Sequence, residues 1–472
     1  MSDRPKNVVW ITLESVRAAN ASVNGYERDT TPNLRRIGSQ PTGTVFSNCF
    51  SQSMWTPASS ASIHTGTYLF EHRVGYDGKA EEPLPQGMVT LPELLREQGY
   101  HTACLTPTAY MSKATGMDQG YDKYHLLVNL QRALKERETR VPFLKYLPKL
   151  WTYGHGLSTD MVKYNKSYVM LETLKRWTRS FANDSEPFFL YTHVPNAHLP
   201  YTPPRKWINQ YTDEIAFSTE EALEFSIETY ASRDRMVQQI ANGCDFTSDE
   251  WEALMAMYDA EINYSDEFVG SLFDHVQALD VGETVFVITA DHGDLFGEHG
   301  LLGHNLVLDD ALTNVPMVVH GLDGLDHAAE SMTQHIDFTR TVAEAMGVPH
   351  DQFSGRDLRE EAPDYAISQR GVPHFDEYLE KNPDFDTSRY HGSPVSAFRT
   401  AEFKFLKSSD KEELLRLPNE ETDVADDHPD VRDSHEERLK SRLQTMKSWG
   451  GSSRQAEYTD AMEQQLADLG YL

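Results

Sequence analysis

The sequence is poor in cysteine and has no long apolar run. Cys49, Cys104 and Cys244 are the only cysteines among 472 residues, and no two have the spacing of a metal-binding or redox pair. They are expected to be buried, unreactive thiols. No apolar run reaches about 18 residues, so no transmembrane segment is expected. The first residues also lack the ordered charged, apolar and cleavage regions of a secretory signal, which predicts a cytoplasmic location.

Basic residues are few compared with acidic ones. The chain carries 43 Lys and Arg against 73 Asp and Glu, a formal net charge of −30. Such a surface repels nucleic acid and anionic lipid, and nucleic acid is not an expected partner. It suits concentrated salt, where charges are screened over a few ångströms. A halophilic source is one interpretation, and an ordinary acidic protein is the other.

One segment departs from this acidic composition. Residues 131–150 contain six Lys or Arg and two Glu. The pattern predicts a solvated amphipathic helix. Guidance of an anionic substrate and contact with a membrane surface are the alternatives.

The distribution of apolar residues indicates an α/β fold. Four short runs rich in β-branched and aromatic residues predict buried strands: Asn7–Leu13, Tyr100–Thr106, Pro187–Val194 and Thr284–Ala290. Helical patterns cover residues 90–99, 168–182 and 250–279. Strands that alternate with helices favour a mostly parallel central sheet flanked by helices. Ligands of such sheets bind at the carboxyl ends of the strands.

The pattern changes after about Val348. Alternating residues in 395–409 predict strands, and an acidic loop in 419–438 leads into a helix. We therefore expect a large domain over residues 1–349 and a small C-terminal α+β subdomain over 350–472, with an acidic loop and terminal helices.

Polar residues at two predicted strand ends suggest a metal site. Glu14 follows the first strand, and Asp291 and His292 follow the run Thr284–Ala290. Carboxylate and imidazole ligands suit zinc or manganese. Thr56 lies at the predicted start of a helix, which also favours a bound anion. Beside a divalent cation its hydroxyl would lose a proton more readily and act as a nucleophile.

Several motifs resemble those of a known family. "DHGDLFGEHGLLGH", followed by "NVPMVVHG", strongly resembles the metal-binding segment of sulfatases in the alkaline phosphatase superfamily. "WTPASSASIHTG" is similar to their nucleophile segment, and "THVPNAHLPYTPP" to a stretch that supplies a substrate-binding histidine. "FSGRDL" and "FRTAEFKFL" resemble late motifs of the family. The resemblance covers nearly the whole chain in order and implies an alkaline-phosphatase-like α/β fold with a sulfatase-like catalytic domain.

Three departures from the sulfatase pattern bear on the chemistry. Sulfatases present two aspartates after the first strand, whereas this chain has Glu14 and Ser15, and we expect the coordination place of Ser15 to be empty. They oxidise a Cys or Ser to formylglycine within C/S-x-P-x-R, whereas this chain has Thr56 and no arginine. Their active-site lysine is replaced by His304.

At the positions where it departs from the sulfatase pattern, the sequence is similar to phosphoethanolamine and lipoteichoic-acid-type phosphotransferases. Those enzymes bind one metal through Glu, a nucleophilic Thr, Asp and His, which implies the set Glu14, Thr56, Asp291 and His292 here. One divalent metal ion is expected: the ligand types favour zinc or manganese, and the sulfatase resemblance suggests calcium or magnesium.

The expected function is a sulfatase-family hydrolase or transferase that acts on a small anionic phosphate or sulfate ester through Thr56. His198 and His304 are expected to bind the substrate or protonate its leaving group. Arg17 is expected to brace the site or, as an alternative, to contact substrate. A sulfatase that works without formylglycine is a second hypothesis, and a non-catalytic binding protein is a third. The oligomeric state is left open.

Other polar residues near these motifs receive structural interpretations. Ser59, Ser60 and Ser62 are alternative nucleophiles, and His193 is expected to be structural. Residues expected to fix the loop after the metal motif are Asp294, Glu298 and His299, and those expected to be solvated on a long helix are Asp259, Asp266 and Asp274. The substrate pocket is expected in loops 107–185 and 205–250.

Overall fold

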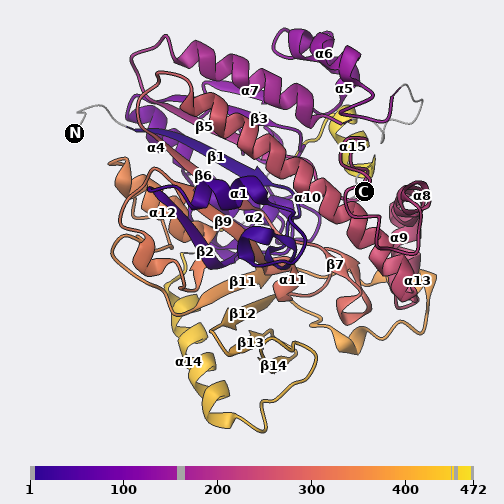
Figure 1. Cartoon of the computed structure of the whole chain (residues 1–472). Helices are drawn as coiled ribbons and strands as arrows, with labels where there is room; N and C mark the ends of the chain where they lie inside the picture. Colours follow the sequence, from indigo (N-terminus) through magenta and orange to yellow (C-terminus); the bar gives the residue numbers. More distant parts are fainter. Residues whose placement is uncertain (1–5, 157–164, 448, 451–454, 469–472) are drawn as a thin grey trace.

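The computed structural model describes residues 6–156, 165–447, 449–450 and 455–468. Its centre is an eight-stranded sheet flanked by helices (Figure 1). In spatial order the strands are β10 (Thr333–Gln334), β2 (Gly43–Phe50), β9 (Asn314–His320), β6 (Thr284–Ala290), β1 (Asn7–Leu13), β5 (Phe188–Val194), β3 (His101–Thr106) and β4 (Lys123–Leu126). Within this sheet β9 alone is antiparallel to its neighbours. The predicted mostly parallel sheet is confirmed.

The middle of the sheet consists of the most apolar runs of the sequence. Every residue of β1, β5 and β6 is buried. Strands covered on both faces need apolar residues at every position, which explains why these runs do not alternate. All four predicted strands are present with nearly the expected bounds.

Helices cover both faces of this sheet. One group includes α1 (Pro32–Gly38), α7 (Ser167–Phe181), α8 (Thr219–Thr229) and the 30-residue α10 (Ser248–Gln277). The other contains α2 (Thr56–Thr65), α4 (Leu91–Glu97) and α12 (His335–Ala345). On β6, Phe286 packs on Phe273 of α10, whereas Thr289 contacts His335 of α12. Residues three apart on a strand point to opposite faces, so the two groups lie on opposite sides.

Two acidic residues of α10 are buried, contrary to the sequence prediction. Asp259 pairs with Arg28 at 2.8 Å, and Asp266 accepts hydrogen bonds from the backbone N–H groups at the start of α1. Asp274 is exposed, as expected. The prediction treated α10 as a surface helix, but the loop and helix after β1 cover it and supply the donors that buried carboxylates require.

A second, four-stranded antiparallel sheet forms the C-terminal part, as expected. It contains β11 (Ala366–Arg370), β12 (Val395–Arg399), β13 (Phe403–Lys407) and β14 (Glu412–Arg416), and α14 (Pro429–Thr445) packs on it. Phe353 and Leu358, which precede this sheet, belong to the core of the large sheet. Helix α15 (Asp460–Asp468) also returns to the large domain, where Leu466 joins the cluster around Trp55. The subdomain is therefore packed against the large domain by segments at both of its ends.

The segment of residues 131–150 forms short helices rather than one amphipathic helix. It contains α5 (Leu130–Ala133), α6 (Arg140–Tyr146) and the 3-10 turn η3 (Leu147–Lys149). Across the described ranges, no helix has both the length and the apolar character needed to cross a membrane. The three cysteines are free and buried, as expected.

Candidate active site

Three neighbouring strands bring the site together. Glu14 directly follows β1, and Asp291 directly follows β6. His193 is the next-to-last residue of β5. In the sheet register Leu13 pairs with both Ala290 and Val194, so the three side chains arise at the same edge of the sheet. This is the edge where parallel sheets bind ligands.

Thr56 joins this group from helix α2. It is the first helical residue, as expected, and Trp55 occupies the capping position. The Thr56 hydroxyl donates to Oε1 of Glu14 at 2.5 Å, and its oxygen lies 3.2 Å from Nε2 of His292. The four expected ligands are thus in one place.

The polar atoms of this cluster are almost completely shielded from water. Glu14 is 5% exposed, and Thr56, Asp291 and His292 are at most 1% exposed. Nε2 of His292 lies 3.4 Å from Oδ2 of Asp291. That Oδ2 atom has no hydrogen-bond donor among the described residues. A buried carboxylate oxygen without a donor is costly unless a cation satisfies it, so the residues present fit a divalent metal.

His193 belongs to the same cluster, which the sequence interpretation missed. Its Nε2 lies 2.8 Å from Oε2 of Glu14 and 3.7 Å from Oδ2 of Asp291. The ligand atoms of Glu14, His193 and Asp291 all lie within 4.8 Å of one another. The signal was its place near the end of the predicted strand Pro187–Val194, whose position beside β1 the sequence alone does not give.

The pKa values of Glu14, Asp291 and His193 are shifted by their burial and by one another's charges. Burial opposes ionisation of Glu14, but attraction to His193 and to the other histidines lowers its pKa. Burial, together with repulsion from Glu14, raises the pKa of Asp291. Burial disfavours the charged His193 imidazole, yet Glu14 raises its pKa overall. Two carboxylates this close compete for positive charge, as expected of a site built for a cation.

Ser15 supports Asp291 through its backbone. Its N–H donates to Oδ1 of Asp291 at 3.0 Å, and its carbonyl accepts from the hydroxyl of Tyr258 at 2.6 Å. Its φ of 56° is left-handed, a conformation that L-residues adopt at a cost and that clusters at functional sites. The Ser15 hydroxyl has no hydrogen-bond partner among the described residues.

Two further histidines border the cluster. The rings of His292 and His304 lie 4.6 Å apart, and those of His304 and His198 5.6 Å apart. Asp294 lies 2.8 Å from Nδ1 of His304 and accepts a hydrogen bond from Tyr201 with its other oxygen. A carboxylate hydrogen-bonded to one imidazole nitrogen fixes the orientation of the ring. Burial lowers the pKa of His198.

The remaining residues of the metal motif are paired within the loop. Arg17 forms an ion pair with Glu298 at 2.8 Å and lies over the ring of Phe296. His299 lies 2.9 Å from Asp309. These contacts favour a bracing role for Arg17 over contact with substrate.

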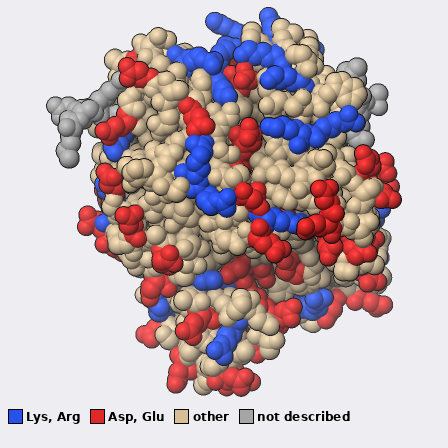
Figure 2. Space-filling model, in the orientation of Figure 1, with Lys and Arg blue, Asp and Glu red and all other residues tan. Residues whose placement is uncertain are grey.

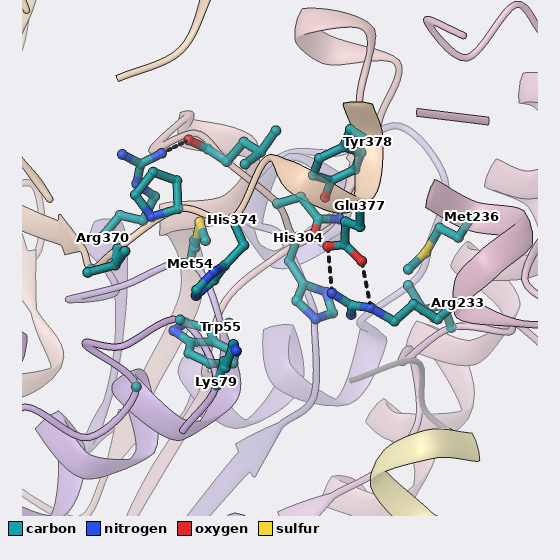
Figure 3. Close-up of a pocket in the computed structure, with 18 residues that line it drawn as sticks. Met54, Trp55, Lys79, Arg233, Met236, His304, Arg370, His374, Glu377 and Tyr378 are labelled. Carbon is teal, nitrogen blue, oxygen red and sulfur yellow. Dashed lines mark hydrogen bonds and ion pairs between the residues drawn. The ribbon is translucent and has the colours of Figure 1, made fainter. Parts of the chain in front are cut away.

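A pocket of about 100 Å³, open to solvent, begins beside His304 and Trp55 (Figure 3). Its apolar lining includes Met54, Trp55 and Met236. Polar groups come from Lys79, Arg233, Arg370, His374 and Glu377, and Arg233 pairs with Glu377 at 2.7 Å.

The location of this pocket corrects the sequence prediction. Of the residues that the structure describes, none in 107–185 lines it, and only Arg233 and Met236 come from 205–250. Residues 370–378 contribute much of the wall instead, because β11 ends beside β2 and α3 (Leu69–His72). That approach of distant segments leaves no pattern in the local sequence.

Comparison with known proteins agrees with this geometry. The family model Sulfatase matches residues 6–348, which is most of the chain. The chain belongs to the sulfatase family. A choline-sulfatase of Rhizobium meliloti is 25% identical over 338 residues, 67% of this chain and 63% of that protein. An N-acetylglucosamine-6-O-sulfatase of Bacteroides thetaiotaomicron is 20% identical, over 85% of this chain and 78% of that one.

Solved structures share the fold of this sulfatase-family protein. The phosphonate monoester hydrolase of Agrobacterium radiobacter superposes with a TM-score of 0.71 at 19% identity, over 94% of this chain and 96% of that one. A 2-O GAG sulfatase superposes with a TM-score of 0.66 at 16% identity, over 94% and 92%. The alkaline-phosphatase-like α/β fold is confirmed. The sequence match spans a little under two thirds of the choline-sulfatase and of an arylsulfatase of Clostridium perfringens, 63% and 64%.

Proposed function

We propose that this sulfatase-family protein is a metal-dependent enzyme that cleaves or transfers a phosphate ester through Thr56. The observation that carries the proposal is the placement of the Thr56 hydroxyl, 2.5 Å from Oε1 of Glu14 and 3.2 Å from Nε2 of His292. A hydroxyl at a helix start, directed at a carboxylate and an imidazole, is a nucleophile with an acceptor for its proton. The start of α2 also favours the negative charge of the ester.

The metal set of this proposal is Glu14, Thr56, Asp291 and His292, with His193 as an additional ligand. The donorless Oδ2 of Asp291 supports it. When bound, a divalent cation supplies Lewis-acid stabilisation of the charge that develops on the reacting oxygens. Nitrogen and carboxylate donors favour zinc or manganese over calcium or magnesium.

The chain's own residues account for the covalent steps. Oγ1 of Thr56 attacks phosphorus in line, the bond from phosphorus to the ester oxygen breaks, and the Thr56 proton passes to Glu14. His304 or His198 gives a proton to the leaving oxygen. Water, in hydrolysis, or an acceptor hydroxyl, in transfer, then attacks phosphorus and gives its proton to the histidine that lost one. The bond from phosphorus to Oγ1 of Thr56 breaks, and Glu14 returns the proton to Thr56.

The Asp294–His304 contact supports His304 in this role. Asp294 at Nδ1 fixes the orientation of the His304 ring, and His304 lines the pocket. The apolar walls beside it fit the organic part of an ester, and substrate enters as a small anion.

Sulfate ester hydrolysis without formylglycine is the second candidate, favoured by the sulfatases among the sequence relatives. A formylglycine hydrate expels sulfate by collapsing to an aldehyde, whereas a threonine adduct has no such exit. Water must then attack the sulfo-threonine at sulfur. The plain threonine hydroxyl therefore favours phosphoryl transfer.

A paired assay tests the choice. We would measure kcat/KM for a sulfate and a phosphodiester of the same aryl alcohol, each with zinc, manganese, calcium and magnesium. The expected result is at least tenfold preference for the phosphodiester with zinc or manganese. A preference for the sulfate would select the second candidate.

Metal analysis distinguishes the two enzymatic functions from a non-catalytic binding role. Purified protein is expected to hold about one equivalent of a divalent metal, and protein that binds none and turns over neither ester would support the binding role. The halophilic source remains a prediction from composition.

A further inference from the structure

Exposed apolar side chains are concentrated in one part of this protein. Among the described residues, six large apolar side chains are exposed, and five of them lie within 18 residues of one another. These are Leu134 (46%), Val141 (49%), Leu144 (50%), Leu147 (44%) and Trp151 (58%). We call residues 131–151 the basic segment. A cluster of this kind on a water-soluble surface marks an interaction site.

The helical geometry holds these side chains outward. Val141, Leu144 and Leu147 recur every three residues along α6 and η3, which places them on one side of the helical run. Tyr146 and Leu150, on the other side, are buried in the core, and Tyr146 stacks on Tyr168 of α7 at 5.7 Å. The segment is therefore anchored by one side and presents an apolar face with the other.

Cations surround this face. Six Lys or Arg lie in the segment, and all six are exposed: Arg132, Lys135, Arg137, Arg140, Lys145 and Lys149. Figure 2 shows Lys and Arg gathered at the top of the view, over α6 and α7, in a protein whose net charge is −30. Lys135 and Arg137 make no side-chain ion pair with any described residue.

The two acidic residues of the segment face inward. Glu138 lies 3.3 Å from Lys123 and accepts a hydrogen bond from the indole N–H of Trp177. Glu136 lies 3.3 Å from His125. Because neighbouring elements engage both carboxylates, the outward face of the segment is positive.

We propose that the basic segment docks this protein on an anionic lipid bilayer. A positive rim around half-exposed Leu and Val is the pattern of interfacial segments that lie in the headgroup region. Trp151, with Arg205 5.0 Å above its ring, has the amphipathic character enriched at that depth. Anionic headgroups complement the cations, and acyl chains complement the apolar row.

Other occupants fit the face less well. A nucleic acid would leave the aliphatic row uncovered, because bases stack on aromatic rather than aliphatic side chains. A second copy would bring two positive faces together, which repel unless salt screens them.

Vesicle binding tests the proposal. The full-length protein is sedimented with vesicles of pure phosphatidylcholine or of phosphatidylcholine and phosphatidylglycerol, at 0.1 M and 1 M salt. Binding is expected only to the anionic vesicles and should weaken as salt shortens the screening length from about 10 Å to about 3 Å. No binding to anionic vesicles at 0.1 M salt would overturn the proposal.

Variants identify the surface that binds. Each basic residue contributes a factor of about five near an anionic membrane, so Lys135→Glu with Arg137→Glu should weaken binding about 25-fold or more. Leu144→Ser with Leu147→Ser should weaken it about tenfold or more. The control is Arg416→Glu with Lys440→Glu, which makes the same charge change at exposed positions of the C-terminal subdomain and should leave binding within twofold.

Two results would contradict this surface. Equal loss in the control pair would mean that overall charge, not the segment, determines binding. Sedimentation equilibrium without lipid should show no self-association that depends on Leu144 and Leu147. A dimer that these substitutions abolish, with no vesicle binding, would assign the face to a second copy and reject the lipid proposal.

Discussion

Nε2 of His193 lies 2.8 Å from Oε2 of Glu14, across the neighbouring strands β5 and β1. The imidazole comes from strand β5, whereas Ser15 follows Glu14 at the place where the sulfatase pattern implies a second aspartate. The hydroxyl of Ser15 makes no contact that would replace a carboxylate. We expect His193, from the neighbouring strand, to supply the donor that Ser15 does not.

His193→Ala should weaken metal binding. If His193 is a ligand, its loss removes one of about five donors and lowers affinity by roughly 100-fold, at the upper end of effects measured even for residues that only support ligands. The measurement is titration of the chelator-treated protein with Zn²⁺ followed calorimetrically. His299→Ala, which removes a histidine paired outside the cluster, is the control and should retain affinity. Unchanged affinity in His193→Ala would return His193 to a purely structural role.

Thr56→Ala should abolish turnover but keep the metal. A lost covalent nucleophile costs roughly 10³- to 10⁶-fold in kcat, whereas three protein ligands and His193 remain. Thr56→Ser keeps a hydroxyl and should retain measurable activity. Thr65→Ala, in the same helix but bonded to Ala61, controls for damage to α2. Near-normal activity in Thr56→Ala would exclude the threonine mechanism, and Ser59, Ser60 and Ser62 would be tested next.

His304→Gln should slow the reaction most for substrates with poor leaving groups. A general acid contributes about 10²- to 10⁴-fold when the leaving oxygen is basic and little when it is a nitrophenolate. We would compare kcat/KM for alkyl and nitrophenyl esters in His304→Gln and His198→Gln. The variant that loses activity with alkyl esters but keeps it with nitrophenyl esters identifies the general acid. Equal losses with both esters in both variants would assign the two histidines to substrate binding alone. Asp294→Asn should show a weaker form of the His304 effect, because it only positions that ring.

Glu261 should make stability depend on pH. Burial raises the pKa of Glu261 to about 7, although Asn196 and the backbone of Thr202 donate to it. Because the folded pKa exceeds the unfolded value of 4.5, the folded protein binds more protons between these values. This contribution is fully present below pH 4.5 and is lost as pH rises toward 7, by up to about 3 kcal/mol.

Melting temperatures between pH 5 and 7 measure this effect. The wild-type protein should lose stability as pH rises, and Glu261→Gln should reduce that slope, since its amide does not titrate. Glu267→Gln, one turn or so along the same helix at a position exposed to solvent, is the control and should keep the wild-type slope. Identical slopes in all three proteins would show that Glu261 is ionised when folded.

The central strands and the proximity of Glu14 to Asp291 could be predicted because their signals are local. Asn7–Leu13 and Thr284–Ala290 are apolar throughout, and the residue after each strand is a carboxylate. Once the strands are parallel, geometry brings Glu14 and Asp291 together. The role predicted for Thr56 required the family resemblance. A threonine before a proline is common at helix starts and does not by itself indicate a nucleophile.

Other features depended on contacts between distant segments. Asp259 was expected in solvent because its helix pattern does not reveal Arg28, which lies 231 residues away and neutralises it. His193 was expected to be structural because the order of strands in the sheet cannot be read from their order in the chain. The pocket wall near residue 372 arises from the C-terminal sheet and has no local signature.

Helix α15 places Leu466 in the cluster that holds Trp55, the residue directly before Thr56. Trp55 also forms part of the pocket wall. Substitutions at Leu466, more than 400 positions along the chain from Thr56, are therefore expected to change the pocket wall without altering Glu14, Asp291 or His292. Directed evolution of this protein should therefore include positions in α15, which a mutant library restricted to the active site would leave out.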